Sequence, residues 1–80
     1  MKVIILSQNE KIYEASSEDI TFPGKEGQFE VLKNHAPSFI LLGEGEIVLK
    51  EKERVKKIPI FSGLVEILGN QITVLVKQPK

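Results

Sequence analysis

Apolar and polar residues alternate over short distances along most of the chain, with a period close to two. Each such run is rich in β-branched residues and ends at glycine, proline, asparagine or charged residues, which favour turns. No window carries the i, i+3, i+4, i+7 apolar stripe of an amphipathic helix. The pattern predicts strands at residues 3–6, 11–15, 19–22, 29–32, 38–42, 46–50, 55–61, 64–68 and 71–77.

The residues between these runs indicate how the strands connect. Gly69-Asn70 is a two-residue signal for a tight hairpin turn of the primed type. The charged run Glu51–Arg54 is typical of a solvated hairpin tip, and Pro59 inside a strand-like run indicates an edge or bulged strand. About eight to ten short strands with regular turns predict an all-β fold, an antiparallel β-sandwich or flattened barrel.

Length and composition limit this fold to one small domain over residues 1–80. A chain of this size buries only ~60–65% of the surface that its unfolded form exposes, so its stability margin is thin. The chain has no cysteine and one histidine, which excludes disulfides and a zinc site of the Cys/His type. We expect no metal and no cofactor.

Charge and hydropathy narrow the classes of partner. The 11 basic and 11 acidic side chains cancel, which argues against nucleic-acid binding. The start MKVIILSQ is too short an apolar run for a signal peptide, and no run approaches the ~20 apolar residues of a membrane span. We therefore expect a soluble, cytoplasmic chain without direct membrane insertion.

Catalytic constellations are missing from the sequence. His35 has only Ser38 as a nearby nucleophile, and a base three positions from its nucleophile in a loop is rarely productive. The segment Gly24–Gly27 lacks the Gly-Lys-Ser/Thr ending of a phosphate loop, so we interpret it as a turn with positive φ at one or both glycines. The residues alone thus predict a non-catalytic module that contacts another protein.

Five motifs in register over the whole chain carry a resemblance to a known family. The chain resembles the N-terminal β-sandwich domain of the epsilon subunit of bacterial F-type ATP synthase. Family members usually have glycine at the position of Glu30, and commonly continue into a C-terminal helical hairpin that restrains ATP hydrolysis; this sequence ends after the last predicted strand. The motifs are Thr21-Phe22-Pro23-Gly24 with Glu26-Gly27, Val31-Leu32 with Asn34-His35-Ala36-Pro37, Gly45-Glu46-Ile47, Ser62–Ile67 and Asn70–Leu75.

The resemblance implies a rotor subunit rather than an enzyme. In the family this domain binds the gamma subunit in the central stalk, as a monomer within the complex, and touches the c-ring. It lies peripherally at the cytoplasmic face of the bacterial inner membrane and helps couple proton or sodium flow to ATP synthesis. By position, Glu26, Gln28 and His35 match the ring-facing loops, and we expect them to share one exposed edge. The residues that face gamma are not assigned by the motifs.

Two other classes of protein remain as alternatives. A lipoyl- or biotinyl-type carrier domain is also a small β-sandwich with its modified lysine at a hairpin tip. Lys52 lies at such a tip, although Glu51 and Glu53 do not match the usual neighbours of that lysine. A small oligonucleotide-binding barrel is disfavoured by the zero net charge.

Overall fold

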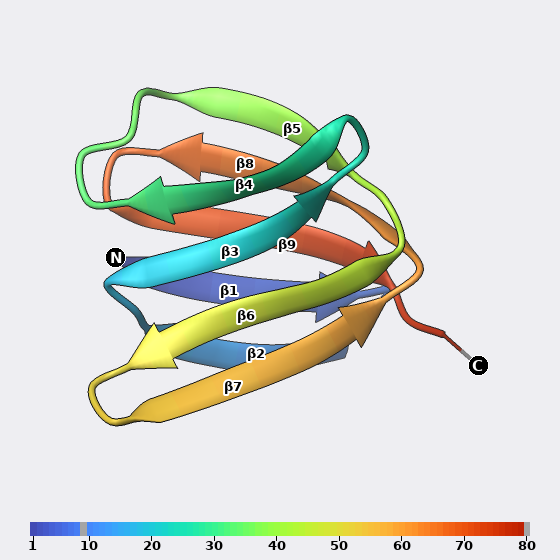
Figure 1. Cartoon of the computed structure of the whole chain (residues 1–80), viewed down its shortest axis with the longest axis horizontal. Coiled ribbons are helices and arrows are strands. Elements are labelled where there is room, and N and C mark those ends of the chain that lie inside the picture. Colours follow the sequence, from blue (N-terminus) through green and yellow to red (C-terminus); the bar gives the residue numbers. More distant parts are fainter. Residues whose placement is uncertain (9, 80) are drawn as a thin grey trace.

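Nine strands and no helix make up the part of the chain that this computed structural model describes, residues 1–8 and 10–79 (Figure 1). Every strand that the alternation predicts is present. Their bounds are β1 (Lys2–Ser7), β2 (Glu10–Ser16), β3 (Asp19–Gly24), β4 (Gly27–Leu32), β5 (Ser38–Leu42), β6 (Gly45–Glu51), β7 (Arg54–Ile60), β8 (Ser62–Leu68) and β9 (Gln71–Lys77).

The strands form two layers. One sheet has the order β2-β1-β9-β8-β5 and the other the order β4-β3-β6-β7 (Figure 1). A single register pair, Gly24 with Leu42, joins β3 of the four-stranded sheet to β5 of the five-stranded sheet. The fold is therefore a β-sandwich that is closed at one corner, as the sequence predicted.

One strand pair departs from the antiparallel expectation. β1 pairs with β9 in parallel, from Lys2 beside Gln71 to Leu6 beside Leu75. Hairpins force neighbouring strands to run antiparallel, but the first and last strands are not joined by a turn. Their relative direction is free of that constraint, and all other pairs are antiparallel.

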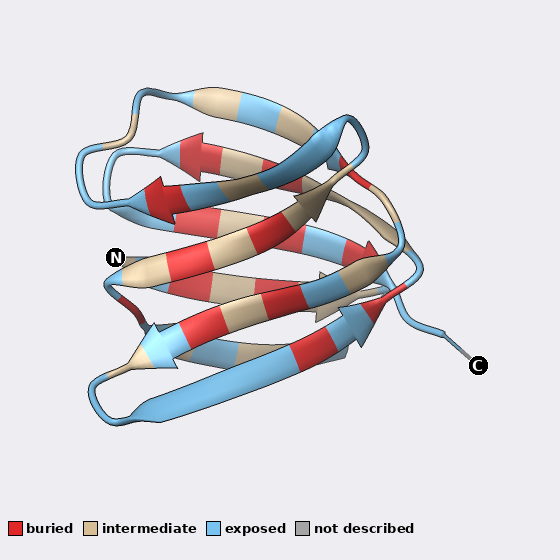
Figure 2. Cartoon of the chain, viewed as in Figure 1, coloured by how far each residue is buried: buried red, intermediate tan, exposed pale blue. Residues whose placement is uncertain are grey.

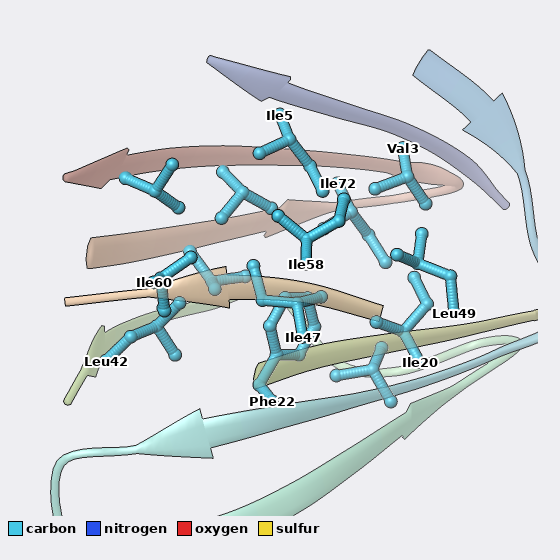
Figure 3. Packing of buried hydrophobic residues seen from close by; sticks show 14 of the residues in the cluster. Val3, Ile5, Ile20, Phe22, Leu42, Ile47, Leu49, Ile58, Ile60 and Ile72 are labelled. Atoms are coloured by element: carbon cyan, nitrogen blue, oxygen red, sulfur yellow. The ribbon is translucent and has the colours of Figure 1, made fainter. Parts of the chain in front are cut away.

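Alternate residues of both sheets point between the layers and form the core. The pattern appears as buried bands spaced along most strands (Figure 2), and Figure 3 shows Phe22, Ile47 and Ile58 between the layers. The Phe22 and Phe29 rings, which are cross-strand neighbours, stack with centroids 5.4 Å apart. The buried apolar residues are Val3, Ile5, Ile20, Phe22, Val31, Leu42, Ile47, Leu49, Ile58, Ile60, Val65, Ile67, Ile72, Val74 and Val76.

The connections match the turn chemistry read from the sequence. Gly69 adopts a φ of 59°, so the β8–β9 hairpin has its glycine at the first central position of the turn. Gly27 closes the β3–β4 turn with a φ of 137°. Lys52, with a φ of 52°, lies at the exposed tip between β6 and β7. Pro59 falls on β7, which is an edge strand.

Candidate protein interface

Four leucines form a continuous row on the outer surface of the five-stranded sheet. Leu41 pairs with Leu64, Leu64 with Leu75, and Leu75 with Leu6, across strands β5, β8, β9 and β1. Each leucine has at least one buried neighbour in its own strand, so the leucines point outward; these buried neighbours are Leu42, Val65, Val74, Val76 and Ile5. We call the four leucines the leucine row. Leu41 is 59% exposed and Leu75 is 48% exposed.

Two more apolar side chains extend this surface. The next row across the same strands runs from Phe39 through Glu66 and Thr73 to Ile4. Phe39 is 67% exposed, the highest value among the large exposed apolar residues. We define the apolar face as the leucine row with Phe39 and Ile4. Contiguous exposed apolar surface of this kind marks interaction sites in soluble proteins.

The outer surface of the four-stranded sheet has a different character. One of its rows reads Glu30, Thr21, Val48 and Lys57 across β4, β3, β6 and β7. A neighbouring row holds an ion pair between Lys50 Nζ and Asp19 Oδ2 at 3.4 Å. The two outer surfaces of the sandwich therefore differ in polarity, and only the apolar face has the composition of an interface core.

A hollow of about 390 Å³ opens at one end of the leucine row, between Leu41, Leu64 and Leu75. Gly63 lines it, and there the strands approach closely. A Cβ added to Gly63 would lie 2.7 Å from the Leu75 carbonyl oxygen. The glycine thus allows β9 to lie close behind the hollow. The apolar face is therefore not flat but has a depression at this end.

The three side chains assigned to the ring-facing loops do not gather at one point. Glu26 lies in the turn before β4, and His35 in the loop after it. Both line a groove of about 570 Å³ between β4 and β5. Gln28 lines a separate hollow with Glu44 and Glu46. Glu26 and Gln28 thus lie near the start of β4 and His35 beyond its end, at the two ends of that strand (Figure 1), so the structure does not bring the three together, and their role at the ring stays a prediction.

His35 and Ser38 do not bond to each other. His35 Nδ1 donates to the Ala36 carbonyl oxygen at 2.7 Å, and Ser38 Oγ donates to the same oxygen at 3.0 Å. The pair therefore ties down the loop between β4 and β5 rather than forming a nucleophile and base. Across residues 1–8 and 10–79, no three His, Asp or Glu side chains cluster in a way that could hold a metal ion.

Sequence reasoning missed a polar contact at the other side of the sandwich. The Tyr13 hydroxyl on β2 donates to Glu51 Oε1 on β6, and Lys56 Nζ lies 5.9 Å from the Tyr13 ring centroid. The hydrogen bond to Glu51, with burial and the Glu51 charge, raises the pKa of Tyr13 to about 12. These contacts tie β2 of one sheet to β6 and β7 of the other, across the side opposite the β4–β5 groove.

The family model and the similar proteins all point to one family. The family model for the β-sandwich domain of the ATP synthase delta/epsilon chain matches residues 1–79. The ATP synthase epsilon chain of Leptospira interrogans is 35% identical over 75 residues, which cover 94% of this chain and 59% of that relative. That of Sulfurimonas denitrificans is 37% identical over 78 residues, 96% of this chain and 60% of the relative. The chain thus spans about three fifths of the length of these relatives.

Solved structures agree on the fold. A chain in the cryo-EM structure of the Tetrahymena thermophila mitochondrial ATP synthase central stalk and c-ring superposes with a TM-score of 0.78 at 16% identity. It covers 96% of this chain and 63% of that one. A chain of the Euglena gracilis mitochondrial ATP synthase superposes with a TM-score of 0.85 at 18% identity, covering 92% of this chain and 48% of that one.

The family match also bears on the alternatives. It includes the Lys52 hairpin tip, so nothing supports a carrier lysine there or an oligonucleotide-binding barrel. The expectation of a non-catalytic subunit agrees with relatives that are epsilon chains. This chain belongs to the family of ATP synthase delta/epsilon chain β-sandwich domains.

Proposed function

We propose that the chain is a non-catalytic domain of the central stalk of a proton- or sodium-translocating F-type ATP synthase. It binds the gamma subunit through the apolar face and contacts the c-ring through polar side chains, and it thereby helps couple ion flow to ATP synthesis. The observation that carries the proposal is the leucine row, an exposed apolar strip on one outer surface of a member of this family.

The physical demands of this task fit the molecule. A part that transmits torque must be stiff and must hold its partner over a broad surface, and it needs no chemistry. A two-layer sandwich with a continuous apolar core resists deformation, because interiors of this kind are close-packed. An outer surface that stays apolar in the isolated chain supplies the desolvation energy for a lasting contact with gamma.

The ring contact is proposed for Glu26, Gln28 and His35. They are distributed along β4 from its first turn to the loop beyond its end, so a contact that uses all three runs along this strand. Gln28 is neutral and Glu26 is charged, so we expect the contact to combine hydrogen bonds with one acidic group. The domain would then lie peripherally at the cytoplasmic face of the bacterial inner membrane.

The test is capture of partners from native membranes by the tagged chain. We expect the wild-type chain to retain gamma and the c-ring. The pair Leu41→Asp and Leu75→Asp should weaken gamma capture more than tenfold, because a carboxylate must be desolvated at the centre of the contact. The double change Glu26→Lys and Gln28→Lys should reduce capture of the c-ring when the complexes have been separated with detergent. Capture of the gamma subunit should be retained.

Val55→Asp is the matched control, because Val55 on β7 is 57% exposed and lies away from the apolar face. It should leave capture of both partners unchanged. If a folded Leu41→Asp, Leu75→Asp variant still captures gamma as the wild type does, the assignment of the apolar face is wrong.

A further inference from the structure

One charged side chain, Glu66, lies inside the apolar face. The two rows of this face cross β5, β8, β9 and β1, and Glu66 on β8 is their only charged member. Its outward neighbours are Phe39 on β5, Thr73 on β9, and Leu64 and Leu68 on β8 itself. A partly exposed carboxylate is thus surrounded by apolar side chains and one hydroxyl group.

The chain itself supplies no cation to Glu66. Among residues 1–8 and 10–79, no lysine, arginine or histidine forms an ion pair with this carboxylate. By contrast Glu14, which extends the same row onto β2, has Lys2 Nζ at 3.4 Å and Lys11 Nζ at 2.6 Å. Lys77 lies four residues further along β9 than the cross-strand partner of Glu66, ~13 Å away. In the free chain, the charge of Glu66 is therefore solvated by water.

A partner that covers the apolar face must compensate for this charge. A carboxylate that loses its water without gaining a cation opposes binding strongly enough to cancel much of the gain from burying apolar area. The same loss of water strengthens an ion pair that forms there. The complementary surface is therefore apolar with a cation at its centre.

Phe39 makes an arginine the cation that fits best. Phe39 and Glu66 are directly opposed across β5 and β8, so their Cβ atoms are ~5 Å apart. The Phe39 side chain is 67% exposed and free to be covered. A planar guanidinium can donate two hydrogen bonds to a carboxylate and stack on a neighbouring ring, whereas a lysine ammonium is a compact point charge.

We propose that Glu66 and Phe39 together receive an arginine side chain of the protein that covers the apolar face. The contact selects a partner whose arginine is surrounded by apolar side chains that meet the leucine row. The identity of that partner as gamma rests on the proposed function. The requirement for a cation rests on the position of Glu66 alone.

A second copy of the chain does not meet this requirement. The only arginine in the sequence, Arg54, begins β7 in the other sheet. Two copies packed face to face about a twofold axis at the centre of the apolar face would also bring two Glu66 carboxylates toward each other. Like charges in such a contact disfavour association.

The direction of the effect of Glu66→Gln tests the contact. Calorimetric titration of the chain with its cognate gamma subunit gives the Kd of the wild type and of the variant. If an arginine meets Glu66, loss of the charge-assisted hydrogen bonds raises the Kd about tenfold or more. If no cation meets Glu66, the variant removes an unpaired charge from the contact, so the Kd falls or is unchanged and the proposal is wrong.

Charge reversal with a matched control separates a local contact from a general effect of charge. Glu66→Lys should raise the Kd more than about a hundredfold, because it places two cations together. Glu53→Lys makes the same change of charge at the exposed tip between β6 and β7 and should change the Kd less than about twofold. Circular dichroism of each variant checks that it is folded.

A double-mutant cycle tests whether the same cation contacts Phe39. Phe39→Leu keeps an apolar side chain but removes the ring. An arginine that touches both residues predicts coupling, so the double variant should bind at least about threefold more tightly than the product of the two single losses. Additive losses, or a carbodiimide cross-link between Glu66 and a gamma lysine, would overturn the shared arginine.

The outcomes distinguish this contact from the proposed function. If gamma binding is lost in the Leu41→Asp, Leu75→Asp variant but unchanged in Glu66→Gln, the arginine contact is wrong and the stalk function stands. If the wild-type chain does not bind gamma, both proposals fall. If the chain alone self-associates and Glu66→Gln strengthens that association, a second copy covers the apolar face and the arginine is overturned.

Discussion

Tyr13 is the only tyrosine of a chain without tryptophan, so its ionisation can be followed without interference. Its hydroxyl donates to Glu51 across the gap between the sheets. A phenolate in this place would lose that hydrogen bond, would be partly buried and would lie beside a carboxylate. For these reasons, which outweigh the opposite effect of Arg54, the pKa of Tyr13 rises from 10.0 to about 12.

The first prediction is a shifted alkaline titration. The folded pKa is raised, so the neutral phenol stabilises the fold at pH values below 10, and this contribution is lost as the pH rises from 10 to about 12. Spectrophotometric titration of the phenolate should give a midpoint near 12 in the native chain. Glu51→Gln should move it down toward 10, because the charge and the carboxylate acceptor are gone. A wild-type midpoint at 10 would contradict this contact.

Single residues also show what the sequence could and could not predict. Gly27 and Gly69 have positive φ where the turn signals required it. His35 and Ser38 each bond to the Ala36 carbonyl rather than to each other. Tyr13 could not be paired with Glu51 in advance, because the contact depends on how two sheets stack, and residues 38 positions apart give no local signal.

At the scale of elements, the pairing of β3 with β4 creates a carboxyl pair on the outer surface of the four-stranded sheet. Asp19 and Glu30 are diagonal neighbours across these strands, Lys50 reaches Asp19 from β6, and Lys57 lies on β7 in the row of Glu30. The Asp19 Oδ1 atom is buried and has no hydrogen-bond partner among the described residues. The neighbouring Asp19 carboxylate raises the pKa of Glu30, because a protonated Glu30 can share its proton with it and because its negative charge disfavours a second one beside it.

The second prediction follows from the sign of that shift. A raised folded pKa means that the fold favours protonated Glu30, so stability is lost as the pH rises through this pKa. Glu30→Gln should raise the thermal midpoint at neutral pH, and the gain should shrink in acid, where Glu30 is already protonated. Unfolding followed by circular dichroism measures both effects.

Glu66→Gln is the control for this prediction. Glu66 lies on β8 between Phe39 and Thr73, so it has no charged neighbour across the strands. It should change the midpoint little and without a trend in pH. A Glu30→Gln chain that is less stable than the wild type at neutral pH would show that the carboxyl pair stabilises the fold.

The strands could be predicted from the sequence, but only some of the pairings between them could. Alternation and turn residues predicted all nine strands, and hairpin turns predicted pairs such as β6 with β7. The parallel pairing of β1 with β9 and the crossing from β3 to β5 at Gly24 join strands far apart in sequence. Nothing local specifies these pairs, because burial of both sheets against each other decides them.

For the whole molecule, the core and the apolar face should differ sharply in their contribution to stability. A chain of this length is expected to have ~4–12 kcal/mol of stability in total. The third prediction is that Ile47→Ala, at a fully buried position, costs ~2–5 kcal/mol, whereas Leu75→Ala, at a half-exposed one, costs less than about 1.5 kcal/mol.

Urea denaturation of the two variants and the wild type provides the comparison. Circular dichroism of each native state serves as the control for folding. Equal losses for Ile47→Ala and Leu75→Ala would mean that the leucine row is needed for the fold itself. A small loss at Leu75 leaves the exposed leucines without a structural role and supports a partner on that side.

The sequence carries a sign of the apolar face that a simple alternation of apolar and polar residues does not explain. β5, β8, β9 and β1 contain several apolar residues at both parities, as in FILL, LVEIL, TVLV and VIIL, whereas β4 and β7 have a single apolar side chain out of parity each, Leu32 and Val55. Strands covered on both faces read as continuous apolar runs. The sequence therefore allows one to infer that a face is covered. It does not tell which leucines are neighbours across the strands, because that depends on the register of the strand pairs.

The place of β9 in the five-stranded sheet has a consequence for synthesis on the ribosome. β9 lies between β1, the first strand to emerge, and β8, and it is the only neighbour of β1 besides β2. Until β9 leaves the exit tunnel, the β1–β2 hairpin cannot dock on the rest of its sheet. A nascent chain therefore leaves Val3 and Ile5, which are buried in the finished fold, without the cover of β9 until Lys77 has left the exit tunnel.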